Sequence, residues 1–259
     1  MGISGIVRSM IGVGILGLAT INIGCASEYS TPGRSADLRA VGVTPEMVQN
    51  GTPNNVDTLM KKKPLAALPT GIAVVRLQAS GYRSQSGEGY GSGKYSVLTT
   101  RDSEPEDAFI RLAKMKMVSG IAPINRLLLP ENLNSDQELR NAAAQLHADM
   151  LLIYTVDTTF RSQDLGTPLP LLTLGLFPDE RMTCVATSSA VLLDTRNGYI
   201  YGLAEATARN SKLTGFWGNR NAMDDARKRT EAESFEKLVG SIEKMWEGVI
   251  VKFDPSKTH

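Results

Sequence analysis

Histidine, cysteine and charge of one predominant sign are scarce in this sequence of 259 residues. It contains two histidines and two cysteines, and its formal net charge is +1. A near-neutral chain offers no clustered basic surface for nucleic acid, so we expect no nucleic-acid partner. His147 and His259 give no metal-ligand spacing and no base beside a nucleophile. We therefore expect no catalytic residue, no metal and no cofactor.

The two cysteines, Cys25 and Cys184, are too few for a disulfide framework. A domain of this length can bury enough surface without disulfides even after export. No histidine or lysine lies close to Cys184 in the sequence to lower its pKa. We expect Cys184 to be a small residue within a strand.

Residues 1–24 resemble a secretory signal peptide. Arg8 is their only charge, and the apolar run MIGVGILGLATINIG follows it. This run has the length of a signal-peptide core and is short and glycine-interrupted for a membrane span. It ends at Gly24 and Cys25, which resemble the bacterial lipobox, whose cysteine is acylated and becomes the mature N-terminus. Lipidation at Cys25 is the favoured prediction, with cleavage after Ser27 or an uncleaved anchor as alternatives.

Residues 25–70 are rich in serine, threonine, proline, glycine and asparagine, a composition typical of a flexible tether. Short helical turns are expected at Pro45–Gln49 and Val56–Lys62. The run of three lysines at 61–63 is expected to be a solvated helix end, with a lipid-headgroup contact as the alternative.

Residues 71–253 are predicted to form one α/β (α+β) domain of order βαβαβββα. We expect a single mixed sheet of three to five strands, with the helices packed on one face. The first strand is IAVVRLQA, and YSVLTT also has strand character. The loop between them lacks the residues of a phosphate-binding Walker motif, so nucleotide binding is not expected.

Capping boxes predict the starts of two helices, one at Ser103 with Glu106 and one at Ser135 with Glu138. The second helix runs into the apolar strand MLLIYTV. A final helix is predicted from the 3–4 spacing of large apolar residues between Phe235 and Ile250, and its last segment, VIVKF, has the alternative of ending as a strand.

Asn197-Gly198 predicts a two-residue type I′ hairpin that pairs Arg196 with Tyr199. This register places one set of residues on a common face: Val185, Ser189, Val191, Leu193, Gly202, Ala204, Ala206 and Ala208. The small residues among them leave room for a helix to pack closely.

The alternating strand directions bring residues 161–180 and 212–221 to the same end of the sheet, where together they form an apolar tip. The residues predicted to contact a membrane or a partner there are Leu169, Leu171, Leu172, Leu174, Leu176, Phe177, Phe216 and Trp217. The alternative is that these residues fold back over the domain's own core.

The order βαβαβββα, the helix-strand step ELRNAAAQLHADMLLIYTV and the long hairpin resemble the periplasmic lipoprotein domain of the curli-secretion channel CsgG. They are also similar to the TolB amino-terminal domain and to lipoprotein activators of peptidoglycan synthases. In the channel family, apolar inserts at strand ends become membrane-spanning hairpins after oligomerisation. The segment LPLLTLGLFP departs from that pattern, since its prolines interrupt the alternation that a transmembrane strand needs.

The resemblance and the lipobox together predict a non-enzymatic envelope lipoprotein that acts through protein contacts in outer-membrane assembly or secretion. Its expected location is the periplasmic face of a bacterial outer membrane, where it is anchored by lipid and binds an unidentified envelope protein. An oligomeric channel component of the curli type, and therefore a homo-oligomer, is one alternative. A periplasmic activator that docks on a cell-wall enzyme is another.

Overall fold

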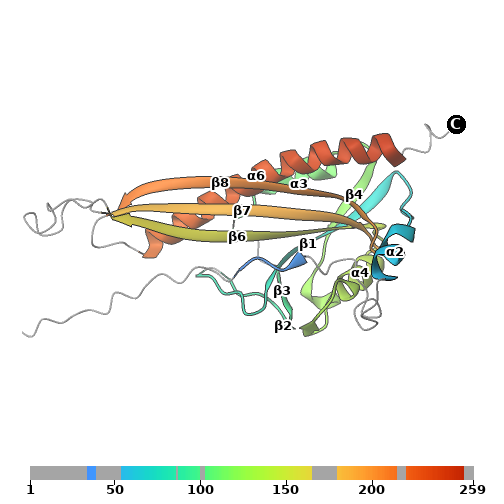
Figure 1. Ribbon diagram of the computed structural model, residues 1–259, viewed down its shortest axis with the longest axis horizontal. Coiled ribbons are helices and arrows are strands. Elements are labelled where there is room, and N and C mark those ends of the chain that lie inside the picture. Colours follow the sequence, from blue (N-terminus) through green and yellow to red (C-terminus); the bar gives the residue numbers. More distant parts are fainter. Residues whose placement is uncertain are drawn as a thin grey trace, which may run out of the picture.

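The computed structural model of the protein describes residues 34–38, 54–85, 87–99, 103–164, 180–214 and 220–253 (Figure 1). Its strands are β1 (Thr70–Ala79), β2 (Ser92–Gly93), β3 (Tyr95–Leu98), β4 (Val118–Pro123), β5 (Asn132–Leu133), β6 (Met150–Asp164), β7 (Glu180–Asp194) and β8 (Ile200–Thr214). Its helices are α2 (Asn54–Lys61), α3 (Glu106–Ala113), the 3₁₀ turn η2 (Arg126–Leu128), α4 (Asp136–Gln145) and α6 (Arg220–Phe253). The principal elements β1, α3, β4, α4, β6, β7, β8 and α6 follow the predicted order βαβαβββα.

The main sheet has six strands, one more than the largest number predicted. Its order is β3-β1-β6-β7-β8, and β4 pairs with β1 as well. β1 has three neighbours because β4 pairs along Thr70–Val74 and β3 along Arg76–Ala79, in addition to β6. β6, β7 and β8 form an antiparallel meander. β2 and β5 form a separate two-stranded sheet, so the prediction of a single sheet was also wrong.

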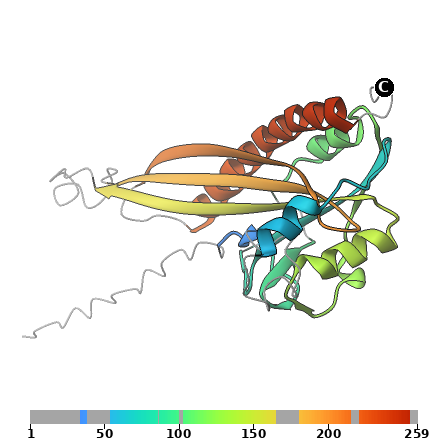
Figure 2. The same ribbon diagram turned by 45° about the vertical axis from the view of Figure 1, so that its right-hand side comes forward.

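Helices cover both faces of the main sheet, whereas the prediction placed them on one face (Figures 1 and 2). The reason is that β1 and β6 are apolar at both alternating sets of positions. The face under α4 includes Ala73, Val75, Leu151 and Ile153. The face under α3 and α6 includes Ile72, Val74, Met150 and Leu152.

Strands β6, β7 and β8 each contain 15 residues, or about 50 Å of extended chain. α6 contains 34 residues, which also span about 50 Å at the rise of a helix. The helix runs along most of the meander (Figure 1). Only Met150–Ile153 of β6 pair with β1. The remainder forms an arm, which consists of residues 154–164, 180–190 and 204–214 with α6 over one face.

The β7–β8 register differs from the prediction by one residue. Leu192 is opposite Gly202 and Ala190 is opposite Ala204, with a bulge beside Leu193. The connection is longer than a two-residue turn, since the Asp194 amide donates to the Tyr199 carbonyl at 2.8 Å. A one-residue shift moves a whole strand's side chains to the other face. The small residues of β8 therefore share their face with the even-numbered residues of β7, and Val185, Ser189, Val191 and Leu193 lie on the opposite face.

The small residues of β8 do accommodate a helix, as predicted. α6 packs along β8 and β7. A Cβ atom at Gly202 would lie 2.5 Å from Sδ of Met245 on α6, so the two backbones approach as closely as glycine permits. Trp246 is 2% exposed within the same core, and its indole N–H donates to the Lys116 carbonyl at 2.8 Å.

One of the two predicted capping boxes forms. Ser135 and Glu138 cap α4 reciprocally. The other does not, because α3 starts after Pro105 without a side-chain cap, and the Ser103 hydroxyl instead donates to Glu231 at 2.9 Å. At the C-terminus, α6 stays helical to Phe253, so VIVKF does not form a strand.

Parts of the predicted tether are attached to the domain. The Ala36 amide donates to Oγ1 of Thr155 at 2.8 Å, and the Arg34 carbonyl accepts from the Ala79 amide at 3.1 Å. The helical turn predicted near residues 56–62 is α2. The turn predicted at 45–49 lies outside the described residues. From Cys25 to the first attached residue there are nine residues, a reach of about 30 Å.

Candidate functional site

The far end of the arm is where the apolar tip begins and ends. Asp164 pairs with Glu180, and Glu180 pairs with Thr214. Neighbouring strands lie about 4.8 Å apart, so these three residues fall within roughly 10 Å of one another. The structure therefore confirms that both tip segments leave the sheet at one end. The eight predicted contact residues of the tip, and Cys25, lie outside the described residues.

A buried ionic cluster fastens α6 to the sheet within the arm. Glu231 of α6 accepts hydrogen bonds from Arg227 at 3.0 Å, from Thr158 of β6 at 2.9 Å and from Ser103 at 2.9 Å. Arg76 of β1 lies 3.4 Å from Glu231. These contacts join α6 to β1, to β6 and to the segment before α3.

Two further carboxylates complete this cluster. Glu104 lies 2.6 Å from Arg76, and Asp224 lies 3.0 Å from Arg227. Both arginines are almost fully buried, which alone would lower their pKa. The carboxylates of Glu104 and Glu231 raise the pKa of Arg76, and those of Glu231 and Asp224 raise the pKa of Arg227. The guanidinium groups therefore stay charged inside the protein. A buried pair of this kind costs several kcal/mol to break, so it fixes the position of the helix on the sheet.

The sequence interpretation missed the ionic cluster, although one signal for it was present. Arg76 is the only charged residue in the buried strand IAVVRLQA, and a buried charge requires a partner. The spacing of Arg227 and Glu231 on α6 is the i, i+4 spacing of an ion pair. Sequence spacing alone does not connect Arg76 to α6, because that contact depends on tertiary packing.

Asp194 organises the opposite end of the sheet and was also missed. It is fully buried. Its Oδ2 accepts from the backbone amides of Leu65 and Ala66 at 2.8 and 2.9 Å, and from the Tyr201 hydroxyl at 2.9 Å. Burial and the hydrogen bond to Asp194 raise the pKa of Tyr201. The segment before β1 is thereby held against the β7–β8 connection.

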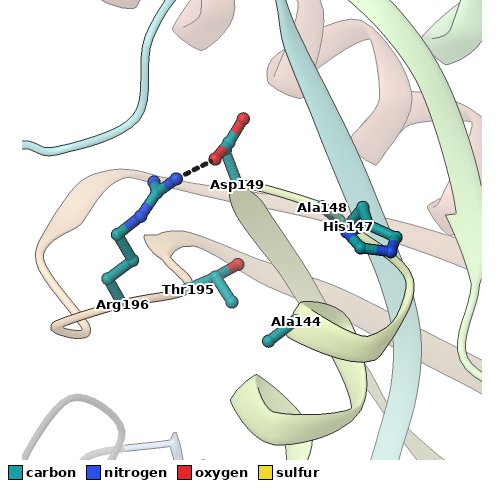
Figure 3. A pocket seen from close by; sticks show the side chains of 6 residues that line it. All are labelled: Ala144, His147, Ala148, Asp149, Thr195 and Arg196. Carbon is teal, nitrogen blue, oxygen red and sulfur yellow. Dashed lines mark hydrogen bonds and ion pairs between the residues drawn. The ribbon is translucent and has the colours of Figure 1, made fainter.

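A hollow of about 200 Å³ lies beside this connection (Figure 3). Arg196 and Asp149 form an ion pair across it at 2.6 Å. His147 lies at its rim with a φ of 55°, a left-handed conformation that ends the α4 turn. The other lining residues are Ala144, Ala148 and Thr195. The carboxylate of Asp149 is thereby paired with the guanidinium of Arg196.

Within the part of the chain that the structure describes, no group of three or more histidine, cysteine or carboxylate side chains could hold a metal ion. Cys184 lies buried in β7, as predicted, and forms no disulfide with any residue that the structure describes. Burial raises the pKa of its thiol, which disfavours the reactive thiolate.

Among the described residues, no helix is both long enough and apolar enough to cross a membrane. The two ends of the described sheet differ: one is closed by hydrogen bonds around Asp194, and at the other the strands lead into the residues of the predicted tip.

No protein-family model matches the chain, and no curated protein matches it. Three solved bacterial structures resemble its fold distantly. A Xanthomonas campestris protein of the DUF330 family is 12% identical, with 72% of this chain and 94% of that chain covered and a TM-score of 0.33. A lipoprotein from Neisseria meningitidis is 14% identical, with 64% of this chain and 100% of that chain covered and a TM-score of 0.27. The PelC dodecamer from Paraburkholderia phytofirmans is 9% identical, with 68% of this chain and 94% of that chain covered and a TM-score of 0.26. Similarity at this level assigns no function to the chain, and a relation to CsgG or TolB stays a prediction.

Proposed function

We propose that this chain is a lipoprotein of a bacterial cell envelope that acts without catalysis, through protein contacts made by the apolar tip. One observation carries the proposal: the arm delivers both apolar segments of the tip to one place, about 10 Å across at its base. A surface that brings leucine, phenylalanine and tryptophan together on a rigid support is suited to a partner protein.

The support for this surface is stiff. The ionic cluster around Glu231 joins α6 to β1 and β6, and the meander is hydrogen bonded over its full 15-residue length. An ordered base lowers the entropic cost of binding, because less of the protein must become ordered at the contact.

The anchor part of the proposal rests on Cys25. A multiply acylated N-terminus binds a membrane firmly, since each buried CH₂ contributes about 0.8 kcal/mol. With a reach of about 30 Å from Cys25 to Arg34, the domain stays beside the membrane surface. We place the anchor in the outer membrane and the domain on its periplasmic side.

The anchor is tested by changing Cys25 to Ser. The wild-type protein should fractionate with membranes, and its mature N-terminal peptide should begin at an acylated Cys25. The variant should lose the acyl mass and leave the membrane fraction. A variant that keeps both membrane association and mass contradicts lipidation.

The tip is tested by deleting Leu169–Phe177. The ends of this segment emerge from directly paired residues, Asp164 and Glu180, so a short loop can reconnect them and the domain should keep its thermal stability. Cross-linking to an envelope protein in membranes should be lost. The matched control is Leu127→Ser, which removes an apolar side chain that is 86% exposed on η2 and should change nothing.

A further inference from the structure

Among the described strands, β8 has the longest edge in the main sheet that pairs with no other strand. β8 ends the strand order, and no described strand pairs with its outer side over Ile200–Thr214. A long open edge is a template for another strand, and proteins usually protect such edges with charged side chains, proline or bulges. β8 contains no proline, and its one irregularity lies at the turn end, beside Leu193.

The charges on β8 are self-complementary. Glu205 and Arg209 are exposed, and both lie on the face that α6 does not cover. They are placed symmetrically about Thr207, which is the middle residue of the strand. Two antiparallel copies of β8 centred on Thr207 would pair over residues 202–212, clear of the bulge at the turn end. This same register sets Glu205 opposite the partner's Arg209, and Arg209 opposite the partner's Glu205.

We propose that two copies of this chain form a symmetric dimer through antiparallel pairing of β8, centred on Thr207. The pairing joins the two meanders into one continuous sheet of six long strands. Each dimer contains two cross-strand ion pairs on one face. The interface is isologous, so it closes on itself and does not propagate into a fibre.

Both copies of the dimer can be anchored in a single membrane. This point rests on the proposed lipid anchor at Cys25. The two-fold axis of an antiparallel strand pair is perpendicular to the sheet, so the uncovered faces of both copies point the same way. The attached segment 34–38 lies on this side, because Ala36 belongs to the same apolar cluster as Val191. Both lipid chains would therefore leave the dimer on one side.

The test uses charge exchange in the full-length protein, purified in detergent and measured by sedimentation. Glu205→Arg places arginine opposite arginine at both cross-strand pairs, and Arg209→Glu places glutamate opposite glutamate. Each variant should therefore weaken dimerisation by about tenfold to thirtyfold. The double variant restores both pairs and should recover most of the affinity. The control is Arg161→Glu, which makes the same charge change on an exposed residue of the same face, on β6.

Cysteine cross-linking gives a second measurement that does not depend on affinity. In a Cys25→Ser background, Thr207→Cys should form a disulfide-linked dimer under mild oxidation. Thr187→Cys should not, although Thr187 lies beside Thr207 on the inner strand β7, with their hydroxyls 3.0 Å apart. A strictly monomeric wild-type protein overturns the proposal, as does a dimer that both single charge variants leave unchanged. Loss of the lipid anchor in the Cys25→Ser test would not affect this outcome.

Discussion

Removal of the Glu231 carboxylate should destabilise the protein more than removal of any exposed charge on α6. Glu231 is 2% exposed and accepts from Ser103, Thr158 and Arg227. In the Glu231→Ala variant, Arg227 and Arg76 keep their charges but lose their shared carboxylate. Breaking a buried ion pair from one side costs about 3–5 kcal/mol. For a protein of this size that loss lowers the Tm by about 6–20 °C.

The matched control for this variant lies two residues away. Glu233 pairs with Lys237 at 2.7 Å, but its side chain is 49% exposed. Glu233→Ala should therefore cost less than about 1 kcal/mol. Urea unfolding followed by circular dichroism measures both free energies. Equal losses for the two variants would refute the reasoning, because they would mean that water already screens the ionic cluster.

Three further predictions follow from single contacts. Gly202→Ala should cost about 1–3 kcal/mol in urea unfolding because its Cβ meets Met245, whereas Gly240→Ala on α6, where nothing lies within 4 Å, should not destabilise. Burial alone would raise the pKa of Asp224, but the hydrogen bond from Lys228 and the charge of Arg227 lower it below 3.8. Asp224→Asn should therefore cost about 1.5–3 kcal/mol of unfolding free energy at pH 7. The difference in stability between wild type and variant should shrink as the pH falls through 3.8 and below. The Cys184 thiol should react with Ellman's reagent only after unfolding, and rapid reaction of the native protein would contradict its burial.

Element order was predictable from the sequence because each principal element has a local signal. The Ser135 and Glu138 box places the start of α4, and the apolar run after it gives β6. Cys184 was also correctly assigned to a strand. The shared exit of the two tip segments needed only the alternating direction of the meander.

The register of the β7–β8 hairpin and the missing cap of α3 were not predictable for a physical reason. The Asn197-Gly198 signal depends on a two-residue turn, but Asp194 holds a longer connection in which the Gly198 amide donates to the Asp194 carbonyl at 2.9 Å. That connection is stabilised by contacts with Leu65 and Ala66, about 130 residues away in the chain. Ser103 likewise leaves its predicted cap because Glu231, 128 residues away, offers a buried acceptor. Local patterns carry no information on such partners.

The most direct test of the proposed function is site-specific photo-cross-linking in intact cells. A photoreactive amino acid at Phe216, in the tip, is compared with one at Arg196, an exposed residue at the opposite end of the same strands. We expect a discrete cross-link to an envelope protein from position 216 and none from position 196. Cross-links from position 196 alone would place the contact surface at the wrong end of the molecule and contradict the account.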